Sequence, residues 1–98
     1  MLGNSIYLNI LIKFMNLKKY SFVLAGELRN KLVLALEEPK SPKQLTDFIK
    51  TQDSSIARCL RELSREKIVK NLFPERKKGR IYVLTKEGEE IRKMIEKS

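Results

Sequence analysis

The chain has no histidine and no tryptophan, and it has a single cysteine, Cys59. It therefore lacks the usual ligands of a zinc site and the pair of a Cys-His nucleophile, and it cannot form an intrachain disulfide. The glycines are far apart and make no phosphate-binding loop, and the acidic residues show no paired-carboxylate pattern. We expect no metal, no cofactor and no enzymatic activity.

Long apolar runs are also missing. Residues 1–17 are rich in Ile, Leu and Phe, but Asn and Lys interrupt them, so the segment is too short and broken to span a bilayer. It lacks the basic start and the small-residue cleavage site of a secretory signal, so we expect a cytoplasmic protein without a membrane partner. We expect residues 1–19 to be an apolar N-terminal segment, helix or strand, that packs on the domain of residues 20–98 or on a second subunit. The alternative is an upstream extension, with Met15 as the natural start.

Positive charge is what the chain has in excess. Its 98 residues include 21 Lys and Arg against 12 Asp and Glu, a formal net charge of +9. Between residues 67 and 86 the sequence contains one acidic residue, Glu75, and all other charged residues there are Lys or Arg. A field of this sign favours nucleic acid or another polyanion as a partner. The length supports one domain with a modest core.

Two helices are predicted in the first half of the domain. Leucine recurs every four residues within residues 20–38, which predicts a core helix that Pro39 ends. Ser41, followed by Pro42 and by Gln44 three residues on, is typical of a helix start. The apolar face of this second, short helix would be formed by Leu45, Phe48 and Ile49.

Residues 51–69 predict a third helix, with Thr51 or Asp53 as its cap. Its apolar stripe consists of Ile56, Leu60 and Leu63 with Cys59 beside them, and its basic residues point elsewhere. Two short, tightly joined helices form a helix-turn-helix. We interpret Cys59 as a small buried side chain rather than a redox switch.

The last third of the chain predicts a hairpin and a helix. Residues 68–73 and 80–85 have the composition of strands, and the loop 74–79, PERKKG, gives the hairpin a basic tip. Thr85 would then cap a last helix. The apolar stripe of that helix is formed by Ile91, Met94 and Ile95. The order predicts an α+β fold.

Two sequence motifs indicate a family. SIARCLRELSREKIV at residues 55–69 and GRIYVLTKEG at residues 79–88 resemble winged helix-turn-helix transcription regulators related to the MarR and ArsR groups, a type common in archaea. The second motif has the family pattern in Tyr82, Leu84, Thr85 and Gly88. The resemblance covers about residues 22–92. It implies three helices, a two-stranded wing and a C-terminal helix, in a homodimeric repressor that binds double-stranded DNA.

The resemblance also implies which side chains face DNA. The second motif helix would enter the major groove, and the wing would touch the backbone or the minor groove. The helix residues and their turn are Gln52, Ser54, Ser55, Ala57, Arg58 and Arg61. The wing residues are Arg76, Lys77, Lys78 and Arg80.

Chemistry adds roles to some of these residues. Arg can make a bidentate contact to guanine, so Arg58 is the leading candidate for reading a base and Arg61 for contacting phosphate. At the start of the first motif helix, Ser41, Lys40 and Lys43 could hold a phosphate, and the alternative is a solvated cap.

Three positions depart from the family pattern. Lys67 stands where a glycine commonly closes the second motif helix, Thr51 replaces an apolar residue in the motif turn, and Val83 with Ile81 gives one strand an apolar face. Apolar residues at 6–15 and 91–95 favour a homodimer.

Two other functions remain open. One is a protein-interaction adaptor that uses the apolar strand face and the N-terminal segment, since fold alone does not fix function. The other is nonspecific binding of DNA or RNA through charge. The sequence has no signature of a small-molecule effector pocket.

Overall fold

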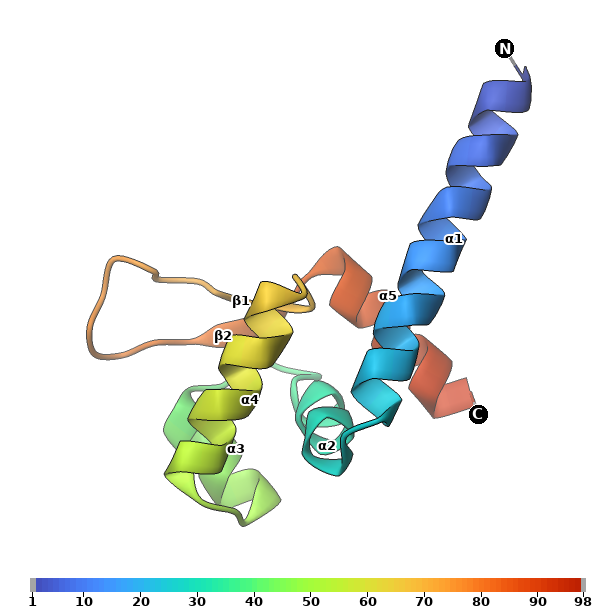
Figure 1. Cartoon of the computed structure of the whole chain (residues 1–98). Coiled ribbons are helices and arrows are strands. Elements are labelled where there is room, and N and C mark those ends of the chain that lie inside the picture. Colours follow the sequence, from blue (N-terminus) through green and yellow to red (C-terminus); the bar gives the residue numbers. More distant parts are fainter. Residues whose placement is uncertain (1, 98) are drawn as a thin grey trace.

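The computed structural model describes the backbone of residues 2–97 and the side chains of residues 6–97; Met1 and Ser98 lie outside the described residues. Within this range the helices and strands follow one another in the order α1 (Leu2–Leu24), α2 (Glu27–Ala35), α3 (Pro42–Ile49), α4 (Asp53–Arg65), β1 (Val69–Asn71), β2 (Tyr82–Leu84) and α5 (Lys86–Lys97) (Figure 1). The antiparallel pair of strands between α4 and α5 gives the winged helix-turn-helix fold that the sequence predicts.

Helix α1 has one packed end and one free end. It runs without a break through residues 19 and 20, where the sequence analysis placed a boundary. Near its C-terminal end Val23 is fully buried, and Lys19 forms an ion pair with Glu87 of α5. The other half projects away from the domain, and its large apolar side chains between Ile6 and Leu17 are 47–70% exposed (Figure 1). The predicted apolar segment is therefore helical, and most of it has no partner within the described chain.

The single core helix predicted over residues 20–38 is wrong. The chain breaks at Gly26, which has an extended backbone (φ −120°, ψ 121°) and precedes α2 without a side-chain cap. Glycine inside a helix costs about 1 kcal/mol relative to alanine, so the break falls where the helix is weakest. Consequently Leu24 ends α1 and is exposed, whereas Leu32 and Leu36 belong to the core. Helix α2 also ends at Ala35, before the predicted end.

Helix α3 begins as the sequence predicts. The hydroxyl of Ser41 accepts a hydrogen bond from the Gln44 amide at 3.1 Å, and the Gln44 side chain accepts one from the Ser41 amide at 2.8 Å. This reciprocal capping box satisfies two backbone donors. The predicted apolar face is only partly right, because Leu45 is buried whereas Phe48 is 65% exposed.

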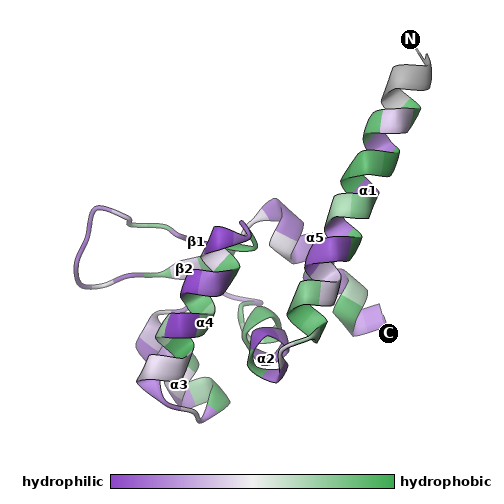
Figure 2. Cartoon of the chain, viewed as in Figure 1, coloured by the Kyte–Doolittle hydropathy of each residue, from purple (hydrophilic) through white to green (hydrophobic). Residues whose placement is uncertain are grey.

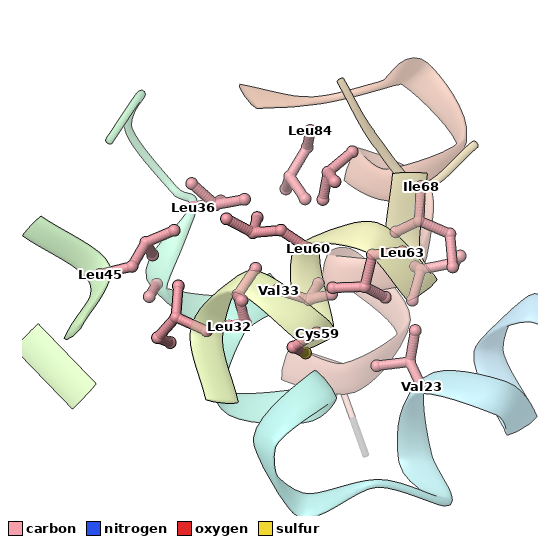
Figure 3. Close-up of a cluster of buried hydrophobic side chains, with 14 residues drawn as sticks. Val23, Leu32, Val33, Leu36, Leu45, Cys59, Leu60, Leu63, Ile68 and Leu84 are labelled. Carbon is pink, nitrogen blue, oxygen red and sulfur yellow. The ribbon is translucent and has the colours of Figure 1, made fainter. Parts of the chain in front are cut away.

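Helix α4 lies at the centre of the core. Its buried side chains are Ile56, Cys59, Leu60 and Leu63, and they pack among buried residues of α2, β1 and β2 (Figure 3). The residue that caps α4 is Gln52, which makes no side-chain capping bond, so the prediction of Thr51 or Asp53 is wrong. Asp53 is instead the first helical residue, where its charge suits the helix dipole.

The turn after α4 takes the geometry that usually belongs to glycine. Lys67 has a left-handed backbone (φ 59°), the Ile68 amide donates to the Leu63 carbonyl at 2.9 Å, and the Lys67 amide donates to the Ser64 carbonyl at 3.0 Å. These two bonds define a Schellman motif. The unusual lysine therefore does not change the turn, although a residue with a Cβ is strained in this conformation.

The strands are shorter than predicted, and a third segment joins them. Strand β1 pairs with β2 in the register Val69–Leu84, Lys70–Val83 and Asn71–Tyr82. On the edge of β2 that faces away from β1, Tyr82 pairs with Lys40. The Tyr82 amide donates to the Lys40 carbonyl at 2.8 Å, and the Lys40 amide donates to the Tyr82 carbonyl at 3.1 Å. Because Lys40 directly precedes the cap of α3, this bridge fixes the start of α3 beside the wing.

The motif Tyr82-x-Leu84-Thr85-x-x-Gly88 holds α5 against the turn after α4. The Thr85 hydroxyl donates to the Lys67 carbonyl at 2.7 Å and accepts from the Gly88 amide at 3.0 Å, which confirms Thr85 as the cap. A Cβ on Gly88 would lie 2.1 Å from the Ile68 carbonyl oxygen, so only glycine fits this close approach.

One part of the case for a dimer changes with the packing of α5. Ile91 is fully buried in the chain's own core, and Met94 and Ile95 are half-buried. The expectation that residues 91–95 form a free apolar surface is therefore wrong at Ile91. The exposed half of α1 remains as the large apolar surface.

Candidate nucleic-acid interface

Helix α4 presents a polar stripe to solvent, opposite its buried face. Residues three and four positions apart share one side of a helix. The stripe consists of Ser54, Ala57, Arg58, Arg61 and Arg65, all of them exposed. Figure 2 shows hydrophilic residues along the outer side of this helix. Of the predicted helix residues, Gln52 in the preceding turn is exposed as well, and Ser55 is half-buried at the edge of the stripe.

Arg65 extends this stripe by one turn; the sequence places it off the apolar face of the helix, but it is not among the residues that the resemblance turns toward DNA. It lies four residues after Arg61, which puts it on the same side of α4, and it is exposed. The spacing of the two arginines was the signal that could have identified it.

The start of α3 is less open than expected. The Ser41 hydroxyl is engaged in the capping box, and the residue is half-buried. Lys43 is exposed, and its contact with Asp47 at 3.5 Å is a surface pair of the kind that contributes little. Lys40 is turned away, because its ammonium donates to the Ala35 carbonyl at 2.6 Å and caps α2. Of the three, Lys43 is the residue that can still reach a phosphate.

The wing loop between β1 and β2 is ordered at its base and charged at its tip. The Asn71 side chain accepts from the Phe73 amide at 2.9 Å, and the Arg76 guanidinium lies 4.1 Å from the centre of the Phe73 ring. Gly79 supplies a left-handed turn (φ 73°). The four predicted basic residues are exposed, and within the described chain none of them forms an ion pair: Arg76, Lys77, Lys78 and Arg80.

The wing and α4 lie on one side of the domain. Figure 1 shows the loop extending from the sheet beside α4, away from the free end of α1. The bridge between Lys40 and Tyr82 brings the start of α3 to the same sheet. The three segments that carry the sequence-predicted residues thus lie beside one another.

A further residue that the sequence did not reveal is Arg29 on α2. Its Nη1 donates to the Phe22 carbonyl at 3.0 Å, its Nε lies 3.5 Å from Glu62 on α4, and its guanidinium lies 4.0 Å from the centre of the Phe22 ring. Arg29 therefore links the end of α1 to the helix that carries the basic stripe. An arginine in a helical segment carries no sequence signal for such a link.

Cys59 lies beneath the stripe, on the inner side of α4, and is buried as predicted. Burial raises the pKa of its thiol to about 11; the Glu62 carboxylate adds to this effect, and the Arg29 guanidinium opposes it. Because the thiolate is the reactive form, a thiol that stays protonated at neutral pH is a poor nucleophile. Within residues 2–97 no group of His, Cys, Asp and Glu side chains could hold a metal ion.

The helices of the described chain include none that is long and apolar enough to cross a membrane, α1 among them. This agrees with the interruption of the N-terminal apolar segment by polar residues.

The comparisons with known proteins identify the fold. No protein-family model matches the chain, and no curated protein sequence matches it. Among solved structures, the chain is similar to reduced HlyU from Vibrio cholerae, with 23% identity, a TM-score of 0.64 and coverage of 94% of this chain and 90% of the other. It is also similar to the reduced form of MarR from E. coli, with 20% identity, a TM-score of 0.67 and coverage of 96% and 72%.

A third similar structure is that of the transcriptional regulator SlyA, with 18% identity, a TM-score of 0.67 and coverage of 97% of this chain and 68% of the other. At these identities the likeness shows the fold. It confirms the winged-helix resemblance that the sequence motifs indicate.

The raised pKa of Cys59 makes stability depend on pH in the alkaline range. A thiol with an ordinary pKa of 9.0 in the unfolded chain and about 11 in the native state stabilises the fold fully below pH 9, and this stabilisation is lost as pH rises toward 11. We expect urea unfolding to show the free-energy difference between wild type and Cys59→Ala shrinking from about pH 8 to about pH 10.5. A constant difference would mean that the thiol is not desolvated in the native state.

Proposed function

We propose that this chain is a sequence-specific double-stranded DNA-binding protein that represses transcription. The observation that carries the proposal is the solvent-facing stripe of α4, in which Arg58 and Arg61 stand among small side chains. A helix of 13 residues is about 20 Å long, and the major groove, about 12 Å wide, admits one helix. For such a regulator we propose a cytoplasmic location.

The small side chains beside the arginines suit close approach to base edges. Ser54 and Ala57 leave the surface of α4 low around Arg58, so that this side chain can extend to the O6 and N7 of a guanine. Ser54 and Ser55 can bond to bases or phosphates. We propose Arg58 as the base reader, with Arg61 and Gln52 at the edges of the groove.

The flanking basic residues would hold the duplex without reading it. Lys43 and the wing residues Arg76, Lys77, Lys78 and Arg80 are exposed, and a phosphate contact made by each would release counterions and strengthen binding at low salt. Ser41 would make no phosphate contact of its own, because its amide and hydroxyl are both bonded to Gln44, and its role is to fix the start of α3. The Asp53 carboxylate would repel a DNA phosphate close to the N-terminus of α4, so the DNA backbone would lie nearer to the lysines.

The charges and the shape favour this function over an adaptor that uses the strand face. The adaptor's interface would consist of Ile81, Val83 and the N-terminal apolar segment; the first two are each half-buried within the chain, and the exposed segment is equally suited to a second copy of the chain. The wing, in contrast, carries four exposed basic side chains that form no ion pair with any described residue. A nonspecific nucleic-acid binder would need the same positive charge, but it would not need an arginine placed among small side chains on a helix.

We expect Arg58→Ala and Lys77→Ala to weaken DNA binding in different ways. Selection from a random duplex pool at about 150 mM salt should first recover a preferred site. On it, Arg58→Ala should lose about 1–3 kcal/mol of discrimination at one G·C pair, whereas Lys77→Ala should weaken all duplexes alike and lower the slope of log K against log salt by about 1.

Lys93→Ala, which removes an exposed charge from α5, is the matched control and should bind like wild type. Failure to enrich any sequence would leave a nonspecific binder. An equal loss on all duplexes for both variants would remove Arg58 from the role of base reader.

We propose that the protein is a homodimer in which the free half of α1 forms the interface. The exposed apolar side chains of this half cover most of the helix surface, and Asn9, Lys13 and Asn16 form one narrow polar stripe, so the helix presents a wide apolar face. Full burial of a large apolar side chain contributes about 1.5–3 kcal/mol, so a second copy that covers this helix gains several such contributions. Two copies of α4 would then read two half-sites about one helical turn apart.

We expect sedimentation equilibrium to show a dimer that Leu11→Glu dissociates. Leu11 is 57% exposed on the projecting half, so the substitution leaves the core intact and buries a charge only in the dimer. Ser21→Glu, an equal charge at an exposed position near the packed end of α1, should remain dimeric. A wild-type chain that stays monomeric at about 100 µM would contradict the dimer.

A further inference from the structure

A groove between α2 and α3 exposes apolar side chains that neither the core nor the proposed DNA interface uses. Phe48 is 65% exposed and Leu34 is 38% exposed, although each lies within a regular helix. A hollow of about 390 Å³ between them is lined by Lys31, Leu34, Ala35, Phe48 and Ile49. None of the side chains proposed to contact DNA lines it.

A second hollow continues the first along the same two helices. It has a volume of about 300 Å³ and is lined by Glu27, Leu28, Lys31, Ile49, Lys50 and Thr51. The two hollows share Lys31 and Ile49, so they form one continuous depression. We call it the α2–α3 groove.

The walls of the α2–α3 groove are held in place before any partner arrives. Helix α3 begins in the capping box of Ser41, and the Lys40 ammonium, fixed on the Ala35 carbonyl, lies 5.0 Å from the centre of the Phe48 ring. Phe48 is therefore an exposed aromatic on a rigid support. A partner that buries it loses little conformational freedom on the protein side.

Charge decides between the candidate occupants. The free end of α1 from a second copy is apolar enough, but residues 1–26 contain lysines and no acidic residue. It would bring positive charge to a rim on which two basic side chains, Lys31 and Lys50, outnumber one acidic side chain, Glu27. The ion pair of Lys31 with Glu27, at 3.2 Å, lies at the surface, where such pairs contribute little. DNA does not suit the first hollow, because four of the five residues that line it are apolar.

We propose that the α2–α3 groove binds a short acidic amphipathic helix of a partner protein. Its apolar residues at helical spacing cover Leu34 and Phe48, and its carboxylates meet Lys31 and Lys50. Helix α2, with 9 residues, is about 14 Å long and matches a partner helix of two to three turns. This binding is separate from the contact with DNA, so one domain can hold a duplex and a partner together.

The test uses peptides, and the absence of tryptophan makes it direct. A displayed library of random 16-residue peptides is selected on the full-length protein, and the recovered peptides are synthesised with one tryptophan. Because the protein has no tryptophan, peptide fluorescence reports binding alone. We expect acidic sequences with apolar residues three and four positions apart, and amide shift changes centred on Lys31, Leu34, Phe48 and Ile49.

Substitutions in the α2–α3 groove test whether the peptide binds there. Phe48→Ser and Lys31→Glu should each weaken the peptide by about tenfold or more, while both retain the native circular dichroism spectrum. Leu24→Ser, at an apolar side chain exposed by 43% outside the groove, is the matched control and should bind like wild type. Phe48→Ser should also leave duplex binding unchanged, which separates this proposal from the proposed function.

Three results would overturn the proposal. One is recovery of peptides that are basic, or that shift the amides of α1 instead of the groove. Another is unchanged peptide affinity in Phe48→Ser. The third is dissociation of a wild-type dimer by Phe48→Ser, which would assign the groove to a second copy of the chain.

Discussion

Burial of one face of α4 is the constraint on which the rest of the structure depends. Ile56, Leu60 and Leu63 insert between α2 and the wing strands, and their loss from water fixes the rotation of the helix about its axis. Once that rotation is fixed, Arg58 and Arg61 must face solvent. The same packing that stabilises the domain therefore exposes its basic stripe, and no other interaction is required to expose the arginines.

The wing and α3 are held beside this helix by hydrogen bonds to backbone carbonyls rather than by ion pairs. The Schellman turn at Lys67 directs the chain into β1, Thr85 bonds that turn to the start of α5, and Tyr82 bridges to Lys40 before α3. A rigid frame of this kind keeps three basic segments at fixed spacing. Preorganised contacts lose less entropy on binding than a flexible basic tail does. The free half of α1 lies outside the frame, where a second copy could add a second reading helix.

The sequence predicts well those features that follow from short-range chemistry. The capping box of Ser41 and Gln44, the inner face of α4 and the Thr85 cap each depend on neighbouring residues, and each is found as expected. The break at Gly26 was missed because a weak helical residue does not itself show whether tertiary packing will bend the chain there. The exposure of Phe48 and the link through Arg29 depend on how α2 lies against α3 and α4. No spacing along the chain encodes that arrangement. The individual DNA contacts remain predictions.

Methylation protection tests the placement of α4 most directly. Dimethyl sulfate modifies guanine N7, which lies in the major groove. On a duplex recovered by selection, we expect the wild-type protein to protect guanines in two clusters about one helical turn apart, and Arg58→Ala to lose protection at one guanine in each cluster. Guanines that react as in free DNA, on a duplex whose backbone the protein shields from hydroxyl radicals, would contradict a helix in the major groove.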